Sequence, residues 1–250
     1  VMTKIIQDLQ EARILLNEDP VKTEGGLSSG NAGESSNFLC YRALRLNYYA
    51  VTGLLARVCL YAGQRENAFN YSTEVIKASN NGIFPFVDRS LVNGTAQDPD
   101  RIFSPEVLFA LSDSQRGELF EEYFDPSLAP NMVFRMETDL LEQTIYGGTG
   151  TGGNLDDYRC RSNWISSGSA RYFYKYSDMT ESGRIENTMI PLLRLGEMYL
   201  IAAESQSNSL ANGVSYINTL RKNRGVSNLQ TLTTTLLQYE YIREVYGEGQ

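Results

Sequence analysis

The chain has 250 residues, of which 42% are hydrophobic and 21% are charged; this length and composition suit a folded protein of one large or two small domains. Its net charge of −8 repels phosphate backbones and anionic lipid, so nucleic acid and charged membrane surfaces are poor partners. The chain contains no histidine, which excludes Ser-His-Asp and Cys-His catalysis and removes the commonest metal ligand.

The amino-terminal segment has a helical pattern. Between residues 3 and 17 the apolar side chains Ile5, Leu9, Ala12 and Leu16 fall on one face, as in an amphipathic helix. Residues 18–37 are rich in Gly, Ser, Glu and Asn and predict an exposed loop.

Residues 41–79 predict a helical hairpin. Residues 41–62 are apolar on nearly every side of a helix, which is typical of a helix buried on several faces. After Gly63, residues 65–79 alternate inward apolar and outward charged positions, and Asn80-Asn81-Gly82 provides a stop signal. Two helices joined by a short glycine turn form an αα-hairpin.

The middle of the chain, residues 83–189, lacks a long helical period and is rich in breakers and aromatic residues. Residues 107–111 predict a short buried strand, and residues 171–176 predict a second strand or an extended segment. An irregular stretch of this length inside a compact domain usually carries function.

Helical patterns return in residues 190–204, 213–223 and 233–246, with Pro191 expected in the first turn of the first of them. Residues 190–204 and 213–223 predict a second helical hairpin. In both hairpins a buried helix is followed by a short turn and an amphipathic helix, as in tetratricopeptide-type repeats. We therefore predict a mainly α fold of tetratricopeptide-like helical hairpins, an α-α superhelix, with an irregular, partly extended insertion that forms the ligand face.

Several sequence runs, in the right order, resemble the SusD/RagB-like family. They are residues 45–63, the Pro-Leu-Leu-Arg to Ala-Ala-Glu run of residues 190–204, residues 216–225 and residues 242–249, with weaker matches at 107–110 and 157–159. The resemblance implies a single domain over residues 1–250, with residues 3–79 and 190–246 as helical scaffold and 83–189 as ligand-binding insertion. Because the family is longer on both sides, we expect this chain to be a fragment lacking both ends.

The resemblance also implies a function. It implies a non-enzymatic, surface-exposed lipoprotein that binds oligosaccharide or polysaccharide. It also implies that this lipoprotein caps a SusC-like TonB-dependent transporter. Localisation in the outer membrane would come from a lipid anchor that is not present in this chain. Two alternatives stay open, which are a helical-repeat scaffold for protein–protein interaction and a peptide-binding member of the same family.

Other chemical motifs favour structural explanations. Arg57, Arg194 and Glu197 lie in segments predicted to be apolar helices. Because buried charged side chains need partners of opposite charge, we predict structural ion pairs between packed helices. The glycine-rich run of residues 147–153 contains GxGxxG, but no helix follows it, so a loop is favoured over a phosphate site.

The acidic clusters and the cysteines give no catalytic or metal site. Pairs such as Glu121-Glu122 and Asp156-Asp157 could serve glycoside hydrolysis or calcium binding, yet solvated carboxylates are the simpler interpretation. Cysteines 40, 59 and 160 form no CxxC pair, so no zinc site is predicted, and a disulfide between Cys40 and Cys160 stays open. We expect no catalytic residue, metal or cofactor.

The aromatic residues of the insertion are the strongest functional signal. Sugars present apolar C–H faces, which flat rings cover, and hydroxyl edges, which amide and charged groups satisfy. We therefore predict ligand stacking on Tyr123, Phe124, Tyr146 and Trp164, and hydrogen bonds from Asn154, Arg159 and Asn163. Tyr123, Phe124 and Tyr146 lie among breaker residues and are expected to be exposed.

Overall fold

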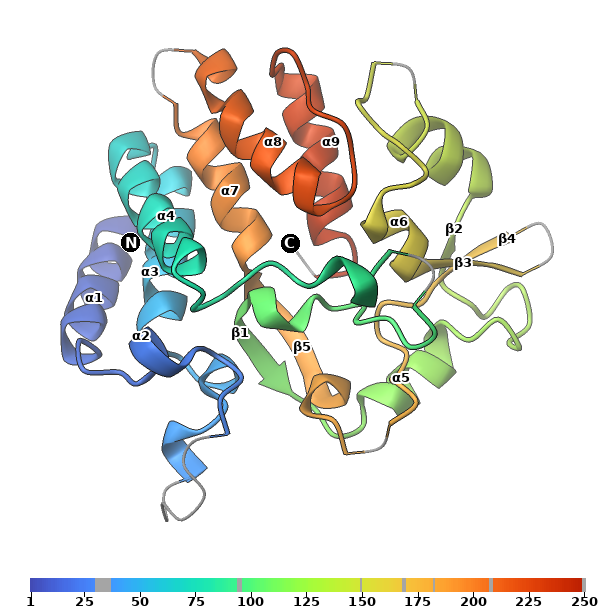
Figure 1. The fold of residues 1–250 in the computed structure, drawn as a ribbon, viewed down its shortest axis with the longest axis horizontal. Coiled ribbons are helices and arrows are strands. Elements are labelled where there is room, and N and C mark those ends of the chain that lie inside the picture. The colour runs from blue at the N-terminus through green and yellow to red at the C-terminus, as the bar shows by residue number, and fades with distance from the viewer. Residues whose placement is uncertain are drawn as a thin grey trace. The chain divides into compact units, whose positions relative to one another are not determined.

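A computed structural model describes residues 1–29, 37–93, 96–148, 150–167, 170–181, 183–206 and 209–248. The chain divides into two compact units (Figure 1). Unit 1 consists of Val1–Phe86, Pro105–Leu111 and Pro191–Ile217, and unit 2 consists of Val87–Ser104, Ser112–Ile190 and Asn218–Gln250. Part of the loop predicted at 18–37 and Thr149 of the glycine-rich run lie outside the described residues. That the chain is one domain stays a prediction.

Unit 1 is mainly helical. Helix α3 packs against α1, α4 and α7, and α4 packs against α7 (Figure 1). The elements of unit 1 are α1 (Met2–Leu15), α2 (Val21–Glu24), η1 (Asn37–Leu39), η2 (Arg42–Leu44), α3 (Tyr48–Tyr61), α4 (Arg65–Asn80), α7 (Leu195–Glu204) and η7 (Leu210–Gly213). The predicted hairpin of residues 41–79 is confirmed as α3 and α4, and the mainly α fold class is confirmed with it.

Asn47 fixes where α3 begins. Its side-chain oxygen accepts a hydrogen bond from the Ala50 N–H at 2.9 Å, which makes it the N-cap. Its amide nitrogen donates to the carbonyl oxygens of Arg42 at 2.9 Å and Leu108 at 2.8 Å. Because Asn47 is fully buried, one side chain satisfies backbone groups of three segments.

The predicted helix at 190–204 begins later than expected. Residues Met189–Arg194 form strand β5, which pairs with β1 (Val107–Ser112), and α7 starts only at Leu195. Pro191 therefore lies in a strand and not in a first helical turn. Pairing with β1 buries this apolar segment, so a tertiary contact decides its conformation. The predicted strand at 107–111 is confirmed as β1.

Two of the charges predicted to form ion pairs, Arg57 and Glu197, pair with each other. The Arg57 guanidinium donates to both carboxylate oxygens of Glu197 at 2.6 Å each, and to the Leu192 carbonyl at 2.8 Å. This bidentate ion pair between a guanidinium and a carboxylate holds α3 against α7.

Unit 2 holds a three-stranded antiparallel sheet of order β2-β4-β3, with Trp164 opposite Phe173 and Arg135 opposite Tyr172. The elements of unit 2 are η3 (Arg89–Leu91), α5 (Arg116–Tyr123), β2 (Arg135–Met136), the π-helical turn η5 (Leu140–Ile145), α6 (Tyr158–Asn163), β3 (Trp164–Ser167), β4 (Ala170–Phe173), η6 (Ile185–Thr188) and α9 (Thr234–Val245). The elements η4 (Ser104–Glu106) and α8 (Val214–Asn223) begin in one unit and end in the other. The second predicted strand is thus confirmed only as far as Phe173.

Four arginines and three carboxylates form a buried arginine cluster in unit 2. Arg159 contacts Asp157 at 2.6 Å, Glu240 at 3.0 Å and Glu244 at 3.1 Å. The other members are Arg221 and Arg243, both bound to Glu240, and Arg224, bound to Glu244. Arg243 and Arg221 also donate to carbonyl oxygens of Ile145, Thr151, Gly152 and Ser227. The cluster joins α6, α8, α9 and the loops between them.

No described helix is both long and apolar enough to cross a membrane. No disulfide joins any of the three cysteines, all of which the structure describes. The described residues also include no group of three or more Cys, Asp or Glu side chains placed to hold a metal ion.

Replacing Asn47 by alanine is expected to destabilise the protein by about 3 kcal/mol, since a cap is lost and buried carbonyl groups lose their donor. Urea denaturation measures the change, and Asn70→Ala, an exposed position on α4, serves as the control with little effect. A loss below about 1 kcal/mol for Asn47→Ala would contradict the capping role.

Burial disfavours ionisation of Glu240, but attraction from Arg159, Arg243 and Arg221 outweighs it and lowers the pKa of this carboxyl group. Its stabilising contribution is therefore full above the unfolded pKa and is lost as the pH falls through the lowered folded pKa. Glu240→Gln is expected to cost about 3 to 5 kcal/mol at neutral pH, because it leaves buried cations uncompensated.

Urea denaturation across the acidic range tests this expectation, with Glu66→Gln on the exposed face of α4 as a charge-matched control. The stability difference between Glu240→Gln and the native chain should shrink as the pH falls. A difference that stays constant down to acid unfolding would contradict the assignment.

Candidate functional site

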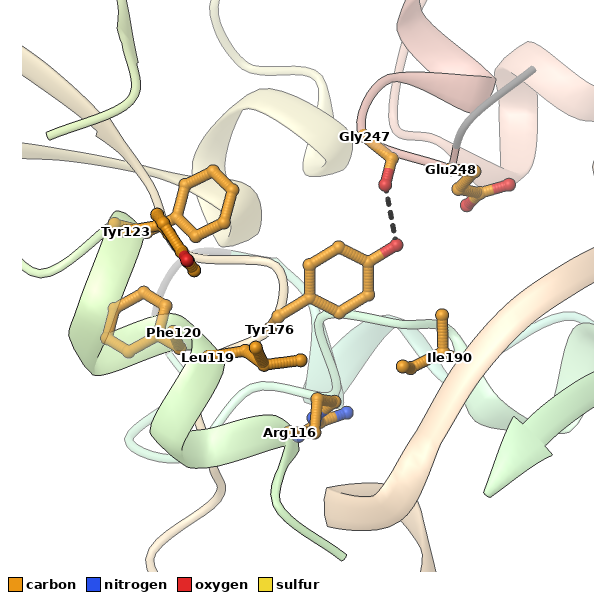
Figure 2. A pocket seen from close by; sticks show the side chains of 9 residues that line it. Arg116, Leu119, Phe120, Tyr123, Tyr176, Ile190, Gly247 and Glu248 are labelled. Atoms are coloured by element: carbon orange, nitrogen blue, oxygen red, sulfur yellow. Dashed lines mark hydrogen bonds between the residues drawn. The ribbon is translucent and has the colours of Figure 1, made fainter. Parts of the chain in front are cut away.

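Unit 2 contains an aromatic pocket of about 380 Å³ (Figure 2). Most of its lining is apolar, and a single arginine and a single glutamate contribute charge. The lining residues are Arg116, Leu119, Phe120, Tyr123, Phe124, Tyr176, Ile190, Gly247 and Glu248.

Helix α5 supplies one wall of the aromatic pocket. Arg116, Leu119, Phe120 and Tyr123 are spaced i, i+3, i+4 and i+7, so they share one face of the helix. Arg116 holds the start of α5, because its guanidinium donates to the carbonyl oxygens of Glu186 at 2.7 Å and Met189 at 3.1 Å, and to Asp178 at 3.1 Å. Both terminal nitrogens of the guanidinium are thus engaged, Nε is buried without a hydrogen-bond partner, and Arg116 is only 2% exposed.

The opposite wall combines a turn after β4 with the turn after α9. The Tyr176 hydroxyl donates to the Gly247 carbonyl oxygen at 2.7 Å, as Figure 2 shows. The neighbouring side chains Lys175 and Glu248 form a buried ion pair. Gly247 has φ of +75°, and a Cβ there would lie 2.5 Å from the Phe173 ring. Only glycine fits this turn without displacing Phe173.

A ring platform, formed by Tyr123, Phe124 and Phe134, continues from the pocket to the surface. The Tyr123 and Phe134 rings lie 5.7 Å apart, and Phe124 lies 6.0 Å from Phe134. The Phe134 N–H donates to the Tyr123 carbonyl at 2.7 Å, which locks the two segments together. Phe134 is 62% exposed and Tyr123 is 37% exposed, so the platform offers flat apolar surface to a ligand.

An exposed carboxylate, that of Glu122, precedes Tyr123 in the sequence. Its acceptor oxygens and its negative charge raise the pKa of the Tyr123 hydroxyl. Tyr123 therefore combines an apolar ring face with a hydroxyl group that can donate and accept hydrogen bonds.

The structure brings two of the seven predicted ligand residues, Tyr123 and Phe124, into this site. Tyr146, expected to be exposed, is only 2% exposed, and burial raises the pKa of its hydroxyl far above the ordinary value. The expectation of exposure was wrong for Tyr146 because η5 turns Leu141, Ile145 and the following tyrosine into one core cluster.

Trp164 belongs mainly to the same core. It is 3% exposed and packs 5.0 Å from both Phe173 and Tyr246. Trp164 also lines a second pocket of about 330 Å³, together with Leu155, Cys160, Arg161 and Arg171.

The three predicted hydrogen-bonding residues have local structural contacts. Asn154 is half-buried and accepts from the Asp156 N–H at 2.7 Å. Arg159 is 1% exposed in the arginine cluster. Asn163 is 5% exposed, and its side-chain oxygen accepts from the Ser162 hydroxyl at 3.1 Å. None of the three lines the aromatic pocket.

Sequence analysis missed Phe134, Tyr176, Leu119 and Arg116. The spacing of Leu119, Phe120 and Tyr123 could have revealed the short α5 face, since it follows the helical period. Phe134 and Tyr176 reach the site through a backbone hydrogen bond and through contact with Gly247, and neither contact has a local sequence signal.

No family model matches the chain, and no curated protein matches it. Solved structures do match. A putative sugar binding protein from Bacteroides vulgatus aligns with 100% of this chain and 51% of its own length, at 23% identity and a TM-score of 0.67. A SusD-like carbohydrate binding protein from the same organism aligns with 98% of this chain and 48% of its own, at 21% identity and a TM-score of 0.60.

The surface glycan-binding protein A from Bacteroides uniformis aligns with 100% of this chain and 55% of its own, at 14% identity and a TM-score of 0.64. The chain therefore spans about half the length of these solved structures. At these identities the likeness concerns the fold. The resemblance seen in the sequence is confirmed at that level: the chain has the fold of SusD-like proteins.

Proposed function

We propose that this chain is part of a SusD/RagB-like protein that binds a glycan without chemical conversion. In this proposal the whole protein lies at the cell surface, held to the outer membrane by a lipid anchor, and passes its ligand to a SusC-like TonB-dependent transporter. The shared fold supports this proposal, as do the neighbours described as sugar-binding, carbohydrate-binding and glycan-binding proteins.

The observation that carries the proposal is the ring platform beside the aromatic pocket. Two exposed rings 5.7 Å apart can cover the apolar C–H face of a sugar, and the Tyr123 hydroxyl can meet its hydroxyl groups. The charged groups of the pocket already form ion pairs, Arg116 with Asp178 and Glu248 with Lys175. The platform therefore supplies the stacking surface, and Tyr123, Phe124 and Phe134 are the proposed ligand residues.

In this proposal the remaining predicted ligand residues stabilise the fold around the ring platform and do not contact the glycan bound there. They are Tyr146, Asn154, Arg159, Asn163 and Trp164. Their side chains are buried or half-buried. Their replacement would lower stability first and affinity only as a consequence.

A protein-interaction scaffold built on the helices is the rival function. It would favour clustered exposed rings on the hairpins of unit 1. Tyr61 on α3 is 75% exposed, but it forms no ring pair with any residue that the structure describes. Among the residues that the structure describes, the exposed rings of Tyr123 and Phe134 lie together in unit 2, which favours a ligand face in the insertion.

A binding screen of the purified protein against a panel of polysaccharides and oligosaccharides, by affinity gel retardation and calorimetry, tests the function. Saturable binding without release of products is the expected result. Product release would identify a glycosidase that uses carboxylates such as Glu121 and Glu122, and silence across the panel would remove the glycan proposal.

The double variant Tyr123→Ala/Phe134→Ala is expected to weaken binding of the strongest panel glycan by about tenfold or more, since each ring contact contributes about 0.5 to 1.5 kcal/mol. Calorimetry measures the affinity, and circular dichroism checks the fold. Tyr61→Ala, which removes a ring of unit 1 that is more exposed than either of these two, is the control. Equal affinity of the double variant and the native chain would eliminate the platform as the site.

A further inference from the structure

The second pocket of unit 2, which Trp164 lines, differs in chemistry from the aromatic pocket. We call it the indole pocket. Its volume of about 330 Å³ lies in the range of small-molecule sites. Two of its lining residues are arginines, and none of them lines the aromatic pocket. The lining residues are Leu155, Cys160, Arg161, Trp164 and Arg171.

The strand register and a neighbouring helix bring the two arginines to one pocket. In the β3–β4 pair, Trp164 lies opposite Phe173 and Ser166 lies opposite Arg171. Because alternate residues of a strand share a face, Trp164 and Arg171 are diagonal neighbours on the same face of the sheet. Arg161 comes from α6, which continues directly into β3.

The floor of the indole pocket is uncharged. Cys160 and Trp164 are each 3% exposed. Burial raises the pKa of the Cys160 thiol to about 12, so this group stays protonated at neutral pH and is not a nucleophile. Leu155 is 42% exposed and adds apolar surface at the rim. The guanidinium groups are therefore the chemically distinctive part of the pocket.

Both guanidinium groups keep donors available for a ligand. Each carries five N–H donors. Among the residues that the structure describes, Arg171 makes one hydrogen bond, from Nε to Glu142 at 2.6 Å, and Arg161 makes one, from a terminal nitrogen to Asp156. The Glu142 and Asp156 side chains are 32% and 63% exposed, and ion pairs open to solvent are weak. Both terminal nitrogens of Arg171 can thus donate to a ligand.

We propose that the indole pocket is a second binding site of unit 2 and takes an acidic sugar through its carboxylate; that the ligand is a sugar rests on the proposed function. The planar fork of Arg171 matches a carboxylate with two parallel hydrogen bonds, and Arg161 donates a further one. Leu155 contacts the C–H groups of the sugar ring. Glu142 and Asp156 offset part of the positive charge, so recognition depends on directed hydrogen bonds, and the ligand competes with Glu142 for Arg171.

The test uses three probes, which are the trimer of galacturonate, its methyl ester and sodium sulfate. The ester keeps the sugar and removes the charge, and sulfate supplies an anion without a sugar. Calorimetry measures affinity. Trp164 is the single tryptophan of the chain and lines the indole pocket, so its fluorescence reports occupancy of this pocket.

The expected result is tighter binding of the galacturonate trimer than of its ester, with a change in tryptophan fluorescence. Arg171→Gln should weaken binding of the trimer by about tenfold and Arg161→Gln by about threefold, because each removes hydrogen bonds to a charged group. Glu142→Gln should tighten it by about threefold, since a competing acceptor is lost. The controls Arg65→Gln and Glu66→Gln, exposed on α4 of unit 1, change the net charge equally and should have no effect.

A purely structural role of the Arg171–Glu142 pair would weaken binding in both variants, so weaker binding by Glu142→Gln would overturn this inference. Equal affinity for the trimer and its ester, or binding of sulfate as tightly as the trimer, would overturn it as well. The variant Tyr123→Ala/Phe134→Ala should retain the fluorescence change, and its loss would assign the acidic sugar to the ring platform.

Two further outcomes separate this inference from the proposed function. Binding of neutral panel glycans without any binding of the galacturonate trimer would overturn the indole pocket as a site and leave the proposed function standing. Absence of binding by every glycan, acidic or neutral, would remove both.

Discussion

The pairing of Arg159 with Asp157, Glu240 and Glu244 is the interaction on which unit 2 depends. Four buried cations face three buried carboxylates, and further backbone carbonyl groups take up the remaining donors. Desolvating these charges is costly, so the cluster fixes one arrangement of α6, α8 and α9 more than it adds net stability. The wall that faces α5 across the aromatic pocket consists of two turns, and each turn lies further along the chain from one of these helices. Helix α6 leads through β3 and β4 to Tyr176, and α9 leads to Gly247.

Contacts between aromatic rings connect the buried core of unit 2 to the ring platform at the surface. Trp164 lies 5.0 Å from Phe173, Phe173 lies 6.0 Å from Phe124, and Phe124 lies 6.0 Å from Phe134. The rings therefore form a continuous series from the buried core to the ring platform. A binding surface supported in this way is preorganised, so little conformational entropy is lost when a ligand stacks on it. The insertion lacks long regular elements, and aromatic contacts take their place.

Sequence alone predicted the elements whose pattern is local. The α3–α4 hairpin and strand β1 follow from apolar periodicity, and the need of Arg57 and Glu197 for partners follows from the cost of burying charge, although the sequence does not say which residues pair. It failed where distant residues decide the outcome. Met189–Arg194 became a strand because β1 lies beside it, and Arg159 and Tyr146 were assigned to the ligand because nothing local indicates their burial. Aromatic composition drew the predicted ligand residues from the insertion, but it could not separate exposed Tyr123 from buried Trp164, since exposure depends on packing.

The most direct measurement is a structure of the protein crystallised with the oligosaccharide that binds most tightly. The account expects a sugar ring stacked on Tyr123 and Phe134, with a sugar hydroxyl within about 3 Å of the Tyr123 hydroxyl, the usual hydrogen-bond distance. An oligosaccharide bound on α3 and α4 in unit 1, with the ring platform left to solvent, would contradict it.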